Sequence, residues 1–159
     1  MARKGDGSPE EALKRAFKFL SYRARSEVEI RLKLTQLGFS QKITETTLEK
    51  LRSLNLLNDE TFARGWAREK GEVRGYGPLR VERELRQKGV AQSLIGRIVQ
   101  ETFGQQETKE RAKKLLEKRF RGKDLSDRKT LHRAIAFLQR RGYRDSVIAE
   151  LIGQTIRDD

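Results

Sequence analysis

The stretch of this chain that most resembles a chemical site is Arg74-Gly75-Tyr76-Gly77-Pro78, because closely spaced glycines cradle phosphate in nucleotide-binding loops. A dinucleotide-binding loop would need a further glycine at position 80, where this chain has Arg80. It would also need a preceding strand, whereas residues 60–72 have a helical pattern. We therefore predict a turn in which Gly75 and Gly77 let the chain reverse and Pro78 begins the next helix.

Residue types that catalyse reactions are scarce in this chain. It has no cysteine and a single histidine, His132, so thiolate chemistry, a histidine-based triad and a histidine metal site are not expected. Glu82 and Glu84 could be mistaken for a carboxylate pair, but residues two apart on a helix point in different directions. We expect no enzymatic activity, no cofactor and no bound metal.

The charge balance indicates an acidic partner. The 159 residues carry 36 Lys and Arg against 23 Asp and Glu, a formal net charge of +13, which is typical of proteins that bind nucleic acid or its complexes. Acidic residues are interspersed throughout, which favours charged helices over a disordered basic arm. The sequence lacks both the ~18-residue apolar run of a membrane span and a signal peptide, so we expect a cytoplasmic protein.

The candidate contacts for an acidic partner are basic residues at or near predicted turns: Arg23, Arg25, Arg68, Lys70, Arg74, Arg80, Arg83, Lys118, Arg119, Arg121, Lys123, Arg140, Arg141 and Arg144. Each also has a simpler interpretation as part of a solvated helix face. Arg80 can pair with Glu84 four residues later, and Arg68 and Lys70 can complement the dipole of the helix that they end.

The aromatic residues near the central turn have two possible roles. Phe62 and Trp66 fall on the apolar face of their helix, so we expect them in the core. Tyr76 lies in the turn, where it either packs across the turn or stacks on a partner. Asn58 or Asp59 is predicted to cap this helix, and for Asp59 we expect such a capping role rather than that of a functional acid.

These residues must be positioned by helices, because helical periodicity dominates and strand-like alternation is absent. Three glycines, 51 and 53 residues apart, are predicted to end helices in the left-handed conformation: Gly38, Gly89 and Gly142. A leucine stands four residues before each of them: Leu34, Leu85 and Leu138. We predict an all-α, elongated tandem array of three three-helix repeats, with units at residues 1–57, 58–104 and 105–159.

The central motif resembles the signature of a known family. Its residues are Leu57-Asn58-Asp59, Phe62-Ala63, Trp66, Arg74-Gly75-Tyr76-Gly77-Pro78, Arg80-Val81, Glu84-Leu85 and Lys88-Gly89-Val90, which resemble the bacterial RecX regulatory proteins. Weaker matches lie in the outer repeats: Arg25-Ser26-Glu27, Glu29-Ile30, Lys33-Leu34, Phe137-Leu138, Arg141-Gly142-Tyr143 and Ile148. The resemblance extends over residues 12–152, nearly the whole chain.

The resemblance implies a function that composition does not show. RecX proteins consist of tandem three-helix repeats and bind the RecA recombinase, especially its filament on single-stranded DNA. They suppress filament extension, ATP hydrolysis and strand exchange, and so temper recombination and the SOS response. They have no catalytic residues and need no cofactor. By this resemblance we expect a monomer that binds the RecA filament, with weak, sequence-neutral binding of single- or double-stranded DNA.

Two other functions stay open at this point. A DNA-binding module acting alone is one, because three-helix units resemble helix-turn-helix domains, although no short helix concentrates Asn, Gln and Arg for base reading. An enzyme is the other, but only scattered carboxylates would be left to perform the chemistry.

Overall fold

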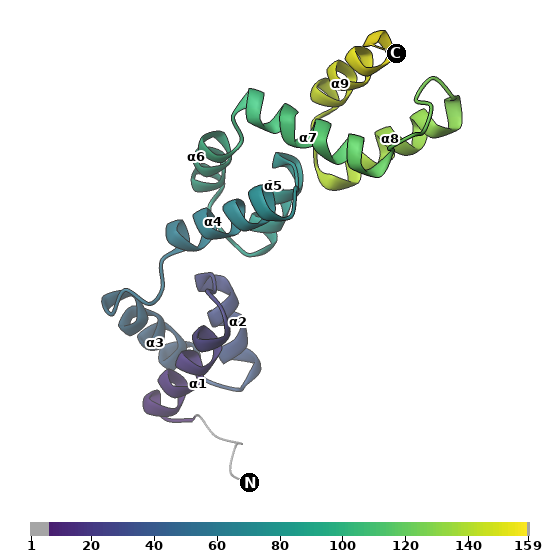
Figure 1. The fold of residues 1–159 in the computed structure, drawn as a ribbon. Helices are drawn as coiled ribbons and strands as arrows, with labels where there is room; N and C mark the ends of the chain where they lie inside the picture. Colours follow the sequence, from purple (N-terminus) through teal and green to yellow (C-terminus); the bar gives the residue numbers. More distant parts are fainter. Residues whose placement is uncertain (1–6, 159) are drawn as a thin grey trace.

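The computed structural model describes residues 7–158, and every regular element in that range is helical (Figure 1). The elements are α1 (Pro9–Tyr22), α2 (Glu27–Gln36), α3 (Gln41–Ser53), α4 (Asp59–Arg68), the π-helical turn η1 (Glu69–Val73), α5 (Pro78–Gln87), α6 (Gln92–Thr102), α7 (Gln105–Arg119), α8 (Arg128–Arg141) and α9 (Asp145–Asp158). The predicted all-α class is confirmed, and the helices form three successive bundles along an elongated body. The exact unit boundaries stay a prediction.

Local signals explain where the helices begin and end. Ser8 and Ser26 cap α1 and α2, and each is part of a complete capping box with a glutamate three residues later. All three predicted glycine stops have the left-handed conformation, with φ of +90° at Gly38, +77° at Gly89 and +97° at Gly142.

Each bundle has its own hydrophobic core, and the three cores do not merge. The first is built around Ile30, Leu34, Leu48 and Leu51; the second around Phe62, Val81, Leu85 and Ile95; the third around Leu138, Tyr143 and Leu151. Phe62 is in the core as predicted, whereas Trp66 is partly buried and packs at its edge. Bundles of this size bury too little to be stable alone, so the contacts between them matter.

The first seam, between repeats 1 and 2, joins the start of α2 to the end of α5. The hydroxyl of the fully buried Ser26 donates to the carbonyl of Lys88 (2.6 Å), and the Lys88 ammonium donates to the Glu29 carboxylate (2.8 Å). The side chain of Val28 fills the space beside Gly89. Of the two predicted caps of α4, Asn58 is the one that caps the helix. Asp59 instead accepts a hydrogen bond from the Glu27 N–H (2.9 Å), because the seam brings α2 to it.

The second seam, between repeats 2 and 3, is a direct backbone contact. The N–H of Gly77 donates to the carbonyl of Arg141 (2.7 Å), and that of Leu79 donates to the carbonyl of Gly142 (2.9 Å). The buried Tyr143 hydroxyl donates to the carbonyl of Gly75 (2.8 Å). Gly75 reverses the chain with φ of +71°, whereas Gly77 has an ordinary φ of −82° and serves instead to let the two backbones approach.

The second seam gives a test of this packing. A Cβ on residue 77 would overlap the carbonyl carbon of Gly142, so we expect Gly77→Ala to lower the free energy of unfolding by about 1–3 kcal/mol. Gly96→Ala is the control, because that helix position faces open space. This substitution should raise the free energy of unfolding by about 0.5–1 kcal/mol, since alanine favours a helix more than glycine does. Urea unfolding of both variants measures this, and a Gly77→Ala protein as stable as the parent would contradict the role of the contact.

Candidate functional site

The second seam brings together six of the predicted basic residues, although they lie far apart in the sequence. They come from the turn before α5, from α5 itself, from the end of α8 and from the turn between α8 and α9: Arg74, Arg80, Arg83, Arg140, Arg141 and Arg144. Beside the seam, an open groove of about 840 Å³ runs between α5 and α8. We call it the α5/α8 groove, and its lining residues are Arg80, Arg83, Glu84, Gln87, Ala136, Gln139 and Arg140. Three guanidinium groups against one carboxylate make it suited to an anionic ligand.

Tyr76 forms an aromatic platform at this seam. The Arg80 guanidinium lies over its ring at 3.6 Å from the centroid, with Arg141 at 5.8 Å and the Lys70 ammonium at 6.0 Å. The ring also packs against the second core, so the predicted packing across the turn is confirmed. The π-helical turn η1 leads into this arrangement, because the Tyr76 N–H donates to the carbonyl of Lys70 (2.8 Å).

Several of the seam cations are already paired within the chain. Arg80 lies 3.4 Å from Glu84, the local pair predicted from their spacing, and Arg144 lies 3.2 Å from Glu82. Glu82 and Glu84 thus point to different partners, as expected for residues two apart on a helix. Within residues 7–158, Arg83 of α5 has no carboxylate within 4.0 Å, and the same holds for Arg140 of α8. These two cations of the α5/α8 groove are therefore open to a ligand.

The two predicted basic residues of the first repeat, Arg23 and Arg25, have internal partners. Arg23 pairs with Glu29 (2.6 Å), and Arg25 donates to the carbonyl of Phe19 (3.4 Å). Burial lowers the pKa of the Arg25 guanidinium, with a further contribution from the neighbouring charge of Arg23. Arg23 thus supports the start of α2, and Arg25 ties the α1–α2 turn to the end of α1.

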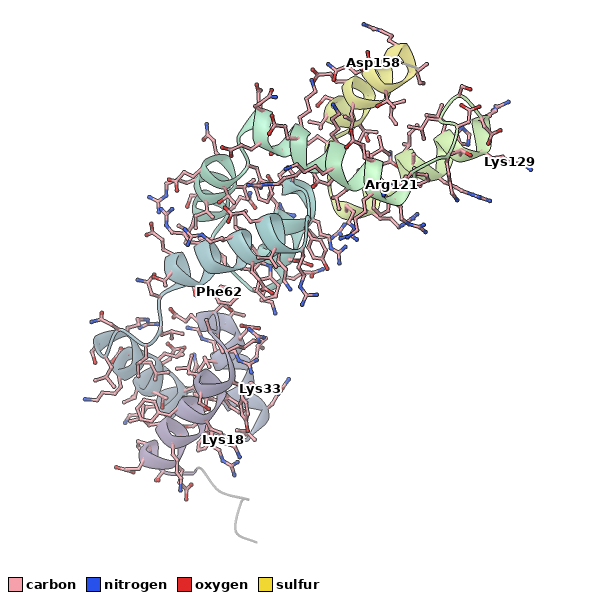
Figure 2. All side chains as sticks on the ribbon, viewed as in Figure 1. Lys18, Lys33, Phe62, Arg121, Lys129 and Asp158 are labelled. Carbon is pink, nitrogen blue, oxygen red and sulfur yellow. The ribbon has the colours of Figure 1, made fainter. Side chains whose placement is uncertain are left out.

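The remaining predicted cations lie in two other places. Arg68, exposed at the end of α4, shares a surface with Glu72 and Glu101, and the Lys70 ammonium lies 4.5 Å from the centroid of the Trp66 ring. The dense cluster around the α7–α8 turn is exposed and comprises Lys118, Arg119, Arg121 and Lys123. Arg121 and Lys123 share a hollow with acidic side chains of α7 and α9, so this surface has a mixed charge. Figure 2 shows nitrogen-tipped side chains distributed along the whole described body.

One basic surface was not predicted from the sequence. Lys14, Arg15 and Lys18 of α1 line an open groove on the outer side of repeat 1. They lie within a helix, away from the turns where we expected contacts, and only their three- and four-residue spacing would have placed them on one face.

Two further observations concern other classes of function. Within residues 7–158 no group of three or more His, Cys, Asp or Glu side chains is arranged to hold a metal ion. In the same part of the chain, no helix combines the length and apolar character needed to span a bilayer.

The chain is similar to RecX regulatory proteins along nearly its whole length. The first, second and third three-helix domains of RecX match residues 12–51, 58–97 and 106–152, respectively. The regulatory protein RecX of Trichlorobacter lovleyi is 32% identical over 152 residues, which cover 92% of this chain and 97% of the relative.

Two solved structures have the same architecture. A crystal structure of a regulatory protein RecX is similar with a TM-score of 0.76 at 28% identity, covering 95% of this chain and 72% of that one. The crystal structure of RecX from Lactobacillus salivarius gives a TM-score of 0.79 over 92% of this chain and 95% of its own; at 21% identity this likeness shows the fold alone.

The ion pairs of the first seam predict a pH dependence of stability. Burial alone would raise the pKa of Glu29, but hydrogen bonds from Arg23, Lys88 and the Ser26 backbone outweigh it and lower this pKa from 4.5 to about 2. A carboxyl group whose pKa is lowered on folding stabilises the fold above its unfolded pKa, and this contribution is lost as the pH falls through its folded pKa.

We therefore expect Glu29→Gln to lower the free energy of unfolding by about 1–3 kcal/mol above pH 4.5. The difference between the two proteins should shrink as the pH falls to about 2. Urea unfolding of both proteins across this range measures it. At pH 7, Glu110→Gln on the exposed side of α7 is the control and should change stability by less than about 0.5 kcal/mol. A difference that does not vary with pH would disprove the charged role of Glu29.

Proposed function

The chain belongs to the RecX family of regulatory proteins, and we propose from this that it binds RecA filaments on single-stranded DNA and inhibits them. In this proposal the protein lowers RecA ATP hydrolysis, filament extension and strand exchange, and thereby limits recombination, repair and the SOS response. The observation that carries it is the match of all three units, in order, to the three RecX domains.

The elongated shape supports binding to a polymer. Three bundles in a row can contact adjacent protomers of a filament at once, and simultaneous contacts give avidity without a deep pocket (Figure 1). A filament on DNA presents both phosphates and acidic side chains, which suit a chain with a net charge of +13. The protein acts in this proposal by binding alone, with no catalysis and no cofactor.

The α5/α8 groove is our candidate for the main contact. Arg83 and Arg140 lie on opposite sides of it without carboxylate partners among the described residues, and Gln87 and Gln139 add hydrogen-bonding groups. A guanidinium binds a carboxylate or a phosphate in a bidentate manner, so the groove fits an acidic side chain or the DNA backbone. The α7–α8 turn is the second candidate, with Arg119 and Arg121.

A DNA-binding protein that acts alone is the alternative function. It predicts tight binding to naked DNA whose affinity falls steeply with salt concentration. Weak, sequence-neutral DNA binding is compatible with both proposals, so only a comparison of filaments with naked DNA at matched salt separates them.

The proposed function makes a prediction about RecA activity. Substoichiometric protein should lower the rate of RecA ATP hydrolysis on single-stranded DNA, because each bound molecule would block filament extension. A coupled ATPase assay with RecA and circular single-stranded DNA measures the rate. If inhibition is absent at every protein concentration and salt condition, the proposal fails.

A further prediction of the proposed function locates the contact. Arg83→Gln/Arg140→Gln should weaken co-sedimentation with RecA–DNA filaments about tenfold, since losing about 1.4 kcal/mol of charge contacts changes Kd by that factor. Arg119→Gln/Arg121→Gln removes the same charge at the α7–α8 turn and is the matched comparison. Equal, unimpaired binding by both variants would refute both candidate surfaces while leaving the filament proposal to the ATPase assay.

A further inference from the structure

The surface of repeat 1 around Gly38 corresponds in position to the surfaces that join the repeats. Gly38 and Leu37 stand 51 residues before Gly89 and Lys88, the residues of repeat 2 that receive the start of α2. The same offset relates the cores, because the fully buried Ala12 and Ala16 of α1 correspond to the fully buried alanines 63 and 67 of α4. It also relates Arg15 to position 66, which holds the tryptophan beside Lys88.

In repeats 2 and 3 this position is occupied by a helix start. At the first seam the docked segment is the acidic first turn of α2, which Ser26 caps. The Ser26 hydroxyl donates to the Lys88 carbonyl, and the Glu29 carboxylate accepts from the Lys88 ammonium. At the second seam the N–H of Gly77 donates to Arg141, next to the glycine stop. Both junctions therefore follow one rule, in which a first helical turn docks on a glycine-terminated helix end.

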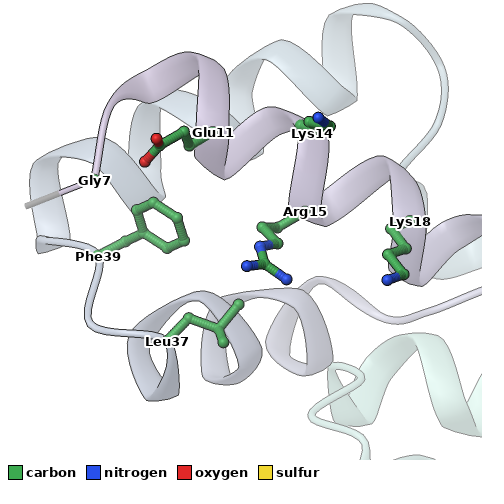
Figure 3. Close-up of a pocket in the computed structure, with 7 residues that line it drawn as sticks. All are labelled: Gly7, Glu11, Lys14, Arg15, Lys18, Leu37 and Phe39. Atoms are coloured by element: carbon green, nitrogen blue, oxygen red, sulfur yellow. The ribbon is translucent and has the colours of Figure 1, made fainter.

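In repeat 1 the corresponding position is open. No heavy atom of the described chain, apart from the immediate neighbours in sequence, lies within 4 Å of the place that a Cβ on Gly38 would take, and Leu37 is 48% exposed. An open groove of about 670 Å³ adjoins it (Figure 3). Its floor is formed by Leu37 and Phe39, and Figure 3 shows Arg15 and Lys18 directed toward it from α1.

The charges of this groove select the kind of occupant. Lys14, Arg15 and Lys18 have no carboxylate within 4.0 Å in residues 7–158, and the one acidic residue in the lining, Glu11, is engaged with Ser8 in the capping box. A second copy of this chain is a poor occupant, because the corresponding helix start of its repeat 3 carries Arg128 and Lys129. Like charges would face each other.

We infer that the groove around Gly38 is a docking site for the acidic first turn of a helix on a protein partner. Arg15 and Lys18 would pair with carboxylates of that turn, in the way that Lys88 pairs with Glu29 at the first seam. Leu37 and Phe39 would pack against an apolar side chain of the same turn. The identity of the partner as RecA rests on the proposed function; the chemistry of the occupant does not.

The first experiment compares two variants of repeat 1 in co-sedimentation with RecA–DNA filaments. Arg15→Gln/Lys18→Gln should bind about tenfold more weakly than the parent. Lys42→Gln/Lys50→Gln removes the same net charge from exposed positions on α3 of the same repeat and should bind like the parent. Equal binding by the two variants would overturn the inference while the proposed function stands. An equal loss of affinity for naked single-stranded DNA would assign the groove to phosphate and would also overturn it.

The second experiment does not depend on RecA. The uniformly ¹⁵N-labelled protein is titrated to millimolar concentration with an acetylated peptide of sequence SEVEIRLKLTQ, which copies residues 26–36. We expect the largest amide shift changes at Leu37, Gly38 and Phe39, and much smaller ones with a peptide in which both N-terminal glutamates are glutamine. Shift changes absent from this groove, or identical for the two peptides, would overturn the inference. If the parent fails to co-sediment with filaments, the proposed function falls and this titration alone decides.

Discussion

The contact on which the array depends is the docking of a helix start against a helix that ends in glycine. At the second seam two backbone N–H groups of one repeat donate to carbonyls at the end of a helix in the next, and a side chain on either glycine would separate them. Helix starts have unpaired donors and helix ends have unpaired acceptors, so one docking satisfies both. This explains why the second helices of repeats 2 and 3 end at corresponding places.

Because the seams are polar, the three apolar cores stay separate and the body grows in length rather than in thickness. Charged groups at the first seam are almost all internally paired, whereas those of the α5/α8 groove are partly free. Basic residues therefore have two uses: Lys88 joins repeats 1 and 2 through Glu29, while Arg83 and Arg140 face outward across the α5/α8 groove. Position relative to the seams, rather than local charge density, separates structural from exposed cations.

The sequence predicted the local features of the fold and missed those that depend on the seams. Helix periodicity and left-handed glycines are signals within a few residues, so Gly38, Gly89 and Gly142 could be identified directly. Asp59 could not, because its partner Glu27 lies 32 residues away and meets it only once the repeats dock. Likewise Arg83 and Arg140 were each candidates, but their placement on one groove follows from the docking of α5 on α8. The cations of α1 were missed because they lie far from any turn.

Trp66 is the one tryptophan of the chain, and it lies at the edge of the first seam. Its indole N–H donates to Glu84 (3.0 Å), and the ammonium of Lys88 lies 4.8 Å from its ring centroid. Indole emission responds to nearby charge and to hydration. The protein thus contains an intrinsic fluorescent reporter, and tilting of its first bundle on the second would change the emission without any added label.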